Sequence, residues 1–160
     1  MTEVRIVSRT AASAQALATR ARKLGLKAQV MDDPDAALAD CPLVVTCTPA
    51  DRVVLSVSAR PDAFIAAVGA FTPRMVELAA GLCRQCADGG GVWLDTADAR
   101  HEAGDLLQAG LDVEAFPTLA DRVRGRSSPR GKGPVLFKSC GWAGWDLAAA
   151  RAAIGSGTTG

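Results

Sequence analysis

Three short polar segments, each placed where a strand is predicted to end, carry side chains suited to a nucleotide cofactor. The first is Ser8-Arg9-Thr10. An arginine offers a planar pair of N–H donors to a phosphate, and neighbouring hydroxyls add further donors. In dinucleotide-binding folds an arginine after the second strand suits the 2′-phosphate of NADP, whereas an acidic residue there selects NAD. A surface arginine beside a helix cap is an equally good interpretation of the same three residues.

The second and third segments follow the next two buried strands of the predicted sheet. Thr46-Cys47-Thr48-Pro49 ends one strand, and Gly69-Ala70-Phe71-Thr72-Pro73 ends the other. Ligands collect at this edge of a parallel sheet, and small residues let the backbone approach a flat cofactor ring. Taken alone, both segments also fit ordinary turns.

The segment Phe137–Gly141 lies between the last predicted strand and the last predicted helix. Ser139 can cap that helix, and free amide groups at its start could hold an anionic or polar ligand. The triple glycine 89–91 precedes a strand, whereas a phosphate-binding glycine loop must follow one and open a helix. We therefore interpret it as a connecting loop. No G-x-G-x-x-G motif occurs elsewhere in the sequence.

Other groups of reactive side chains favour structural roles. Cys83 and Cys86 have the C-x-x-C spacing but lack a second ligand pair or a nearby histidine, so we expect no metal site. His101, Glu102 and Asp105 lie in one predicted helix, where exposed carboxylates are common. A structural or subunit-contact role is favoured for them, with acid–base catalysis as the minor alternative. The tryptophans at 142 and 145 favour packing over a substrate cage.

Short apolar runs alternate with helical patterns along the whole chain, which predicts an α/β Rossmann-type doubly wound parallel sheet. The dinucleotide-binding domain is expected to span residues 1–154, and residues 155–160 to form a flexible tail. Strands are predicted at 4–8, 27–31, 43–47, 64–68, 92–94 and 135–137, and helices at 10–24, 34–39, 75–84, 97–109, 118–124 and 141–154.

Composition narrows the class of protein further. The chain has 160 residues, 49% of them hydrophobic, and a formal net charge of +1. Near-neutral charge argues against a general nucleic-acid-binding or membrane-surface protein, and no apolar run has the roughly 20 residues of a membrane helix. The chain opens directly on a strand pattern without a leader, so we expect a cytoplasmic protein. A basic stretch at 122–132 is interpreted as a solvated loop.

Seven segments occur in an order that resembles the ornithine cyclodeaminase/mu-crystallin family, and the bacterial reductases of Δ1-pyrroline-2-carboxylate and Δ1-piperideine-2-carboxylate in particular. The resemblance covers roughly residues 4–153. The segments are Ser8-Arg9-Thr10, Val45-Thr46-Cys47-Thr48-Pro49, Ala67-Val68-Gly69-Ala70-Phe71-Thr72-Pro73, Glu77-Leu78, Leu94-Asp95-Thr96, Glu102-Ala103-Gly104-Asp105-Leu106 and Phe137-Lys138-Ser139-Cys140-Gly141-Trp142-Ala143.

The resemblance implies an enzyme, usually a homodimer, that passes hydride from NADPH to a cyclic ketimine carboxylate and yields proline or pipecolate. It places Arg9 and Thr10 at the adenosine phosphate. It also places the turn of Thr46, Cys47 and Thr48 beside the cofactor. The remaining positions implied for NADP(H) are Val68 and Gly69 near the nicotinamide, and Ser139 and Gly141 in a loop that closes over it.

Two departures from the family pattern matter. Phe71 stands where the deaminating members place a catalytic aspartate, so imine reduction is favoured over ornithine deamination. The part of the family that holds the first Rossmann strand, its glycine-rich loop and the substrate-binding lysine and arginines has no counterpart here, so the catalytic residues stay unknown. Two inner strands should then have unpaired edges. The alternatives are a mu-crystallin-like binding protein without turnover and an inactive remnant, and the ring size of the imine stays open.

Overall fold

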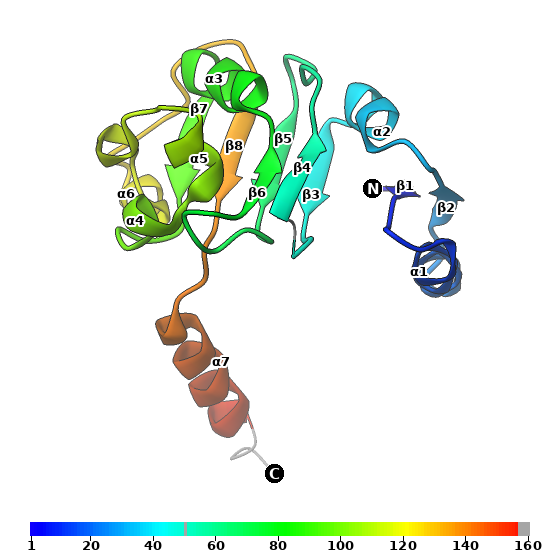
Figure 1. Ribbon diagram of the computed structural model, residues 1–160. Coiled ribbons are helices and arrows are strands. Elements are labelled where there is room, and N and C mark those ends of the chain that lie inside the picture. The colour runs from blue at the N-terminus through cyan, green and yellow to red at the C-terminus, as the bar shows by residue number, and fades with distance from the viewer. Residues whose placement is uncertain (50, 157–160) are drawn as a thin grey trace.

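A computed structural model describes residues 1–49 and 51–156, and its centre is a sheet of four parallel strands (Figure 1). The strand order is β3 (Leu43–Thr46), β5 (Phe64–Ala67), β8 (Val135–Lys138) and β7 (Gly91–Leu94). Each of these strands was predicted from a short apolar run, and the α/β Rossmann-type architecture is confirmed. The carboxyl ends of the four strands lie along one edge, where the predicted cofactor turns are found.

Helices connect the strands in chain order. They are α1 (Ala11–Lys23), α2 (Pro34–Asp40), α3 (Ala80–Asp88), α4 (Ala99–Glu102), α5 (Gly104–Gln108), a 3-10 turn η1 (Val113–Ala115), α6 (Leu119–Val123) and α7 (Ala143–Ser156).

The N-terminal strands form a separate parallel pair, β1 (Glu3–Ile6) with β2 (Lys27–Val30), joined by α1. The hydroxyl of Thr10 accepts a hydrogen bond of 3.3 Å from the amide of Ser13 and so caps α1 at its start. Beyond its end Gly25 has a φ of +80°, which glycine adopts without strain. A small apolar cluster of Ile6, Ala14 and Ala18 holds this unit together.

The β1–β2 pair and the four-stranded main sheet do not pair with each other in the part of the chain that the structure describes. β1 is hydrogen-bonded to β2, and β3 to β5. The β3 side chains Leu43 and Val45 are 55% and 62% exposed. The N-terminal unit stands to one side of the main sheet (Figure 1), and an ion pair between Arg5 and Asp40 links it to α2. The gap in the sheet lies between β1 and β3, the two inner strands whose edges were expected to be unpaired.

We predict that the 160 residues alone self-associate and bind NADPH weakly, because unpaired backbone groups on β1 and β3 favour pairing with another chain. Size-exclusion chromatography with light scattering, followed by an NADPH titration, measures both properties. A stable monomer with micromolar affinity for NADPH would contradict this prediction.

Two short strands were missed by the sequence analysis. β4 (Asp51–Leu55) pairs in parallel with β6 (Val76–Leu78). The helix predicted for 75–84 is therefore wrong in its first part, since the amides of Glu77 and Leu78 donate to the side chain of Asp105 instead of forming helical bonds. The contact with Asp105, which is distant in the sequence, determines that these residues form a strand and not a helix.

The predicted helical boundaries also change at two places. The helix expected over 97–109 is divided into α4 and α5 at Ala103, whose ψ of 76° is not helical. At the C-terminus α7 continues to Ser156, so Gly155 and Ser156 do not belong to a tail; residues 157–160 of the expected tail lie outside the described residues.

The cysteines at 83 and 86 lie inside the main core, on α3. Both are completely buried, and burial raises the pKa of each thiol to about 12. A neutral, buried thiol packs as a small apolar side chain. Among residues 1–49 and 51–156, no group of three or more potential ligands is placed to hold a metal ion.

Helix α7 leaves the sheet after β8 and extends away from it (Figure 1). Trp142 and Trp145 at its start have ring centroids 5.5 Å apart in an edge-to-face arrangement, and about half of each side chain is exposed. The two rings contact each other, and whether they also contact a ligand stays a question left by the sequence analysis. No helix of the described residues combines the length and apolar character needed to cross a bilayer.

Candidate functional site

The turns that follow β3 and β5 are held together by one buried carboxylate, that of Glu77 on β6. Its Oε1 accepts from the amide of Thr48 at 2.7 Å and from the Thr48 hydroxyl at 2.8 Å. Its Oε2 accepts from the amides of Gly69 at 2.8 Å and Ala70 at 3.2 Å. Four hydrogen bonds are thus donated to the two oxygens of this one side chain.

Gly69 is required by the close approach of these turns. A Cβ at this position would lie 2.2 Å from the carbonyl oxygen of Thr48 and 2.4 Å from Oε1 of Glu77. Real Cβ atoms do not come so near backbone atoms, so any side chain would push the two turns apart. The structure therefore brings two of the predicted cofactor residues, Thr48 and Gly69, into one rigid assembly.

A buried ion pair, on the inner side of the molecule, also holds the turn that follows β5. Nζ of Lys138, at the end of β8, lies 3.0 Å from Oδ2 of Asp105 and donates to the carbonyl oxygen of Ala70 at 2.6 Å. Oδ1 of Asp105 accepts from the amides of Glu77 and Leu78 at 2.6 and 2.9 Å. The ionic side chains of Glu77, Asp105 and Lys138 are essentially inaccessible to solvent. The pair therefore connects β8, α5 and β6 to the turn after β5.

The outer side of the turns is apolar and accessible. Val68 is 42% exposed and Phe71 is 53% exposed, whereas Ala70 between them is buried. Next to them Cys47 is exposed, and Thr46 is buried with an Oγ1 that finds no partner among the described residues. The close approach at Gly69 is filled by Thr48 and Glu77, so the surface left accessible at these turns is the apolar one of Val68 and Phe71.

The loop after β8 is arranged differently from the expectation. Oδ2 of Asp95 accepts from the hydroxyl of Ser139 at 2.7 Å and from the amides of Cys140 and Gly141 at 3.0 and 2.9 Å. These amide groups are therefore not free for an anionic ligand, and Ser139 does not cap α7, which begins at Ala143. Ser139 and Gly141 stay beside the site as a loop anchored by Asp95.

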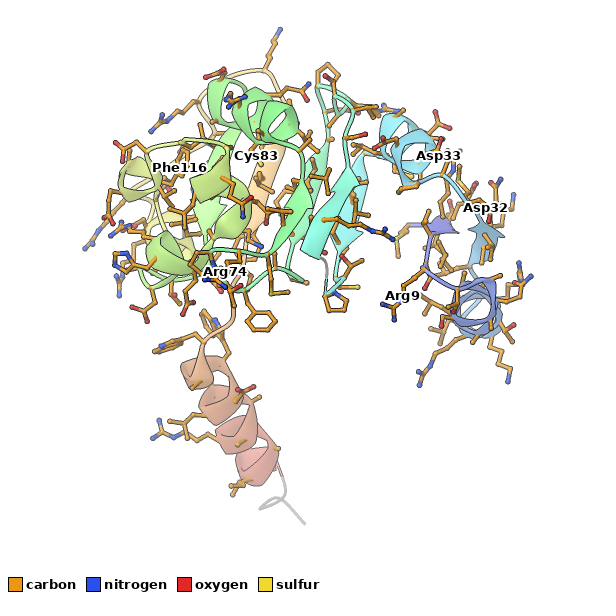
Figure 2. All side chains as sticks on the ribbon, viewed as in Figure 1. Arg9, Asp32, Asp33, Arg74, Cys83 and Phe116 are labelled. Carbon is orange, nitrogen blue, oxygen red and sulfur yellow. The ribbon has the colours of Figure 1, made fainter. Side chains whose placement is uncertain are left out.

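Ser8, Arg9 and Thr10 lie on the separate N-terminal unit. The Thr10 hydroxyl caps α1 and donates to the Ser13 hydroxyl at 2.8 Å, so helix capping is one established role of this residue. Ser8 and Arg9 are exposed, and Arg9 has no ion-pair partner within the described residues. Figure 2 shows Arg9 at the same lower edge as Arg74, which follows the Phe71 turn, with the interruption in the sheet between them.

The residues that organise the site were quoted in the sequence analysis, but no function was given to them. The exposed position expected for Asp105 is wrong, because this residue is 1% exposed. Its ion pair with Lys138 agrees with the structural role that the sequence favoured. His101 is exposed and does not join it. The sequence signal for these residues was a charged side chain inside an apolar run, as in Val76-Glu77-Leu78 or Phe137-Lys138. Such a side chain is buried only when an opposite charge or several hydrogen bonds compensate it.

Comparison with known proteins agrees with this architecture. The model of the ornithine cyclodeaminase/mu-crystallin family matches residues 1–156. Δ1-pyrroline-2-carboxylate reductase 1 of Burkholderia multivorans is 43% identical over 121 residues, which cover 76% of this chain and 37% of that protein. Ketimine reductase mu-crystallin of Mus musculus is 30% identical over 160 residues, 99% of this chain and 48% of that protein.

Solved structures show the same fold. Δ1-pyrroline-2-carboxylate reductase of Thermococcus litoralis, in complex with NADH and L-proline, superimposes with a TM-score of 0.83 at 22% identity, over 94% of this chain and 48% of that one. Iminosuccinate reductase of Paracoccus denitrificans, with NAD+, gives 0.79 at 22% identity, over 96% of this chain and 48% of that one. The chain thus spans about half the length, or less, of the relatives it matches.

Proposed function

Because the chain belongs to the ornithine cyclodeaminase/mu-crystallin family, we propose that it forms the cofactor-binding part of an NADPH-dependent reductase. The substrate is a cyclic ketimine carboxylate, Δ1-pyrroline-2-carboxylate or Δ1-piperideine-2-carboxylate, and the product is proline or pipecolate. The observation that carries the proposal is the apolar, accessible turn of Val68 and Phe71 above Glu77 and Gly69.

A bound nicotinamide supplies hydride to the carbon of the C=N bond. This chain contributes the surface on which such a ring rests: the amides of Gly69 and Ala70 are turned inward to Glu77, and Val68 and Phe71 face outward. An apolar face excludes water, which would otherwise hydrolyse the imine. Phe71 cannot accept a proton or orient a water molecule, so the same turn disfavours deamination.

Lys138 is not assigned as the proton donor to the imine nitrogen. Lys138, the buried lysine nearest to the turn, is already engaged by Asp105 and by the carbonyl of Ala70. We therefore assign it a structural role. We also propose that the protein forms a homodimer and is located in the cytoplasm, as expected in the sequence analysis.

The test is a hybrid protein in which these 160 residues replace the corresponding part of the Burkholderia multivorans reductase. We expect it to oxidise NADPH when Δ1-pyrroline-2-carboxylate or Δ1-piperideine-2-carboxylate is added, and to release no ammonia from ornithine. The parent reductase serves as the positive control. A folded hybrid that binds NADPH without turning over either imine would instead favour the ligand-binding alternative.

Selectivity for NADPH is expected to depend on Arg9. In the hybrid, Arg9→Ala should weaken NADPH binding by roughly 10- to 100-fold, because a charge-assisted hydrogen bond to the 2′-phosphate contributes about 1.5–3 kcal/mol. NADH, which lacks that phosphate, should bind with unchanged affinity. Fluorescence titration of both cofactors measures the difference, and Arg20→Ala on the exposed face of α1 is the matched control. Equal losses for the two cofactors would refute the assignment.

A further inference from the structure

Glu77, unlike Asp105, has no cationic partner among the residues that the structure describes. Lys138 is paired with Asp105 at 3.0 Å, so these two charges compensate each other. The four hydrogen bonds to Glu77 come from neutral groups, the amides of Thr48, Gly69 and Ala70 and the hydroxyl of Thr48. The cluster of two carboxylates and one ammonium group therefore carries an excess negative charge, located on Glu77.

The position of that charge matters because it lies directly behind the turns that form the proposed ring surface. Glu77 is 0% exposed, so water does not screen it efficiently. Its donors belong to the residues adjoining the accessible Val68 and Phe71. A nicotinamide is neutral when reduced and positively charged when oxidised, so a fixed negative charge at this place stabilises the oxidised form more than the reduced form.

We infer that Glu77 is a positioning residue that also sets the preference of the site for the oxidised over the reduced cofactor. The inference rests on the proposed function, since it requires the nicotinamide to lie on the Val68–Phe71 turn. The carboxylate acts through the two turns that it holds and through its charge. Positive charge develops on the ring as hydride leaves, so the same carboxylate lowers the barrier to transfer.

The ratio of the dissociation constants for NADP+ and NADPH, measured in the hybrid protein, tests this inference. In Glu77→Gln we expect the affinity for NADP+ to fall on the order of tenfold more than that for NADPH, the size of a charge–charge interaction partly screened by the protein. In Glu77→Asp, which keeps the charge but is one methylene shorter, both affinities should fall while their ratio is retained. Glu114→Gln, at an exposed carboxylate on η1, is the control.

The outcomes separate the explanations. Equal losses of both cofactor forms in Glu77→Gln would overturn the electrostatic role and leave a structural one. If Glu77→Gln does not fold, Glu77→Asp still decides, because a tenfold change of the ratio with the charge retained would contradict the inference. Amide hydrogen exchange at Thr48, Gly69 and Ala70 should accelerate in both variants, and unchanged exchange would overturn the positioning role. Failure of the unmutated hybrid to bind either form would instead count against the proposed function.

Discussion

Replacing Lys138 by methionine is expected to lower the free energy of unfolding by about 3–5 kcal/mol, the usual cost of leaving one member of a buried ion pair without its partner. Lys138 and Asp105 are both completely buried, with their charged atoms 3.0 Å apart. Methionine has a similar length but cannot donate to the carbonyl of Ala70 or compensate Asp105. Urea unfolding of the hybrid protein followed by circular dichroism measures the change.

The double variant Lys138→Met/Asp105→Asn is the informative companion. It removes both charges while the asparagine oxygen still accepts from the amides of Glu77 and Leu78. We therefore expect it to recover part of the stability lost in Lys138→Met. Lys132→Met, at an exposed position in the loop before β8, should change stability by less than about 0.5 kcal/mol. A Lys138→Met chain as stable as that control would show that the pair does not hold the site together.

Alanine at position 69 should be the second most damaging change, and its effect on the cofactor should exceed its effect on stability. The added methyl group would come within 2.2–2.4 Å of Thr48 and Glu77, so the turns after β3 and β5 must separate. Overpacking of this kind costs about 1–3 kcal/mol. Because the displaced atoms form the ring surface, NADPH affinity in the hybrid protein should fall by more than about tenfold.

Gly81→Ala provides the matched control for this substitution. Gly81 lies in α3, and a Cβ there would have no heavy atom within 4 Å. Alanine is favoured over glycine in a helix by up to about 1 kcal/mol, so this variant should be neutral or slightly more stable. Cofactor titrations and urea unfolding of the two variants side by side make the comparison. Equal cofactor affinity in Gly69→Ala and Gly81→Ala would contradict the close approach seen in the structure.

The parts of the fold that the sequence predicted correctly are those encoded by local signals. The Thr10 cap, the periodic apolar residues and Gly25 define α1 within a few residues of its observed ends. The strands of the main sheet are continuous apolar runs, which identify buried parallel strands. The interruption between β1 and β3 also followed from the sequence, because the resemblance placed these strands on either side of the family's first Rossmann strand, a position that no described strand fills.

The site could be predicted only in part, since its organisation depends on contacts between distant segments. The turns at Thr48 and Gly69 were recognised, but the Glu77 carboxylate that joins them is 29 and 8 residues away along the chain. The amides of Cys140 and Gly141 were expected to be free, and Asp95, 45 and 46 residues earlier, accepts from both. Sequence patterns do not reveal which buried carboxylate meets which turn.

Hydride transfer itself is the measurement that tests the central claim most directly. The hybrid protein would be supplied with Δ1-pyrroline-2-carboxylate or, separately, Δ1-piperideine-2-carboxylate, together with NADPH carrying deuterium at the transferable position of the nicotinamide. The proline or pipecolate formed would be analysed by mass spectrometry. We predict one deuterium on the α-carbon of proline, and loss of that product in Gly69→Ala but not in Gly81→Ala. A folded hybrid that binds NADPH yet forms no deuterated proline or pipecolate from either imine would contradict the assignment of this chain to a ketimine reductase.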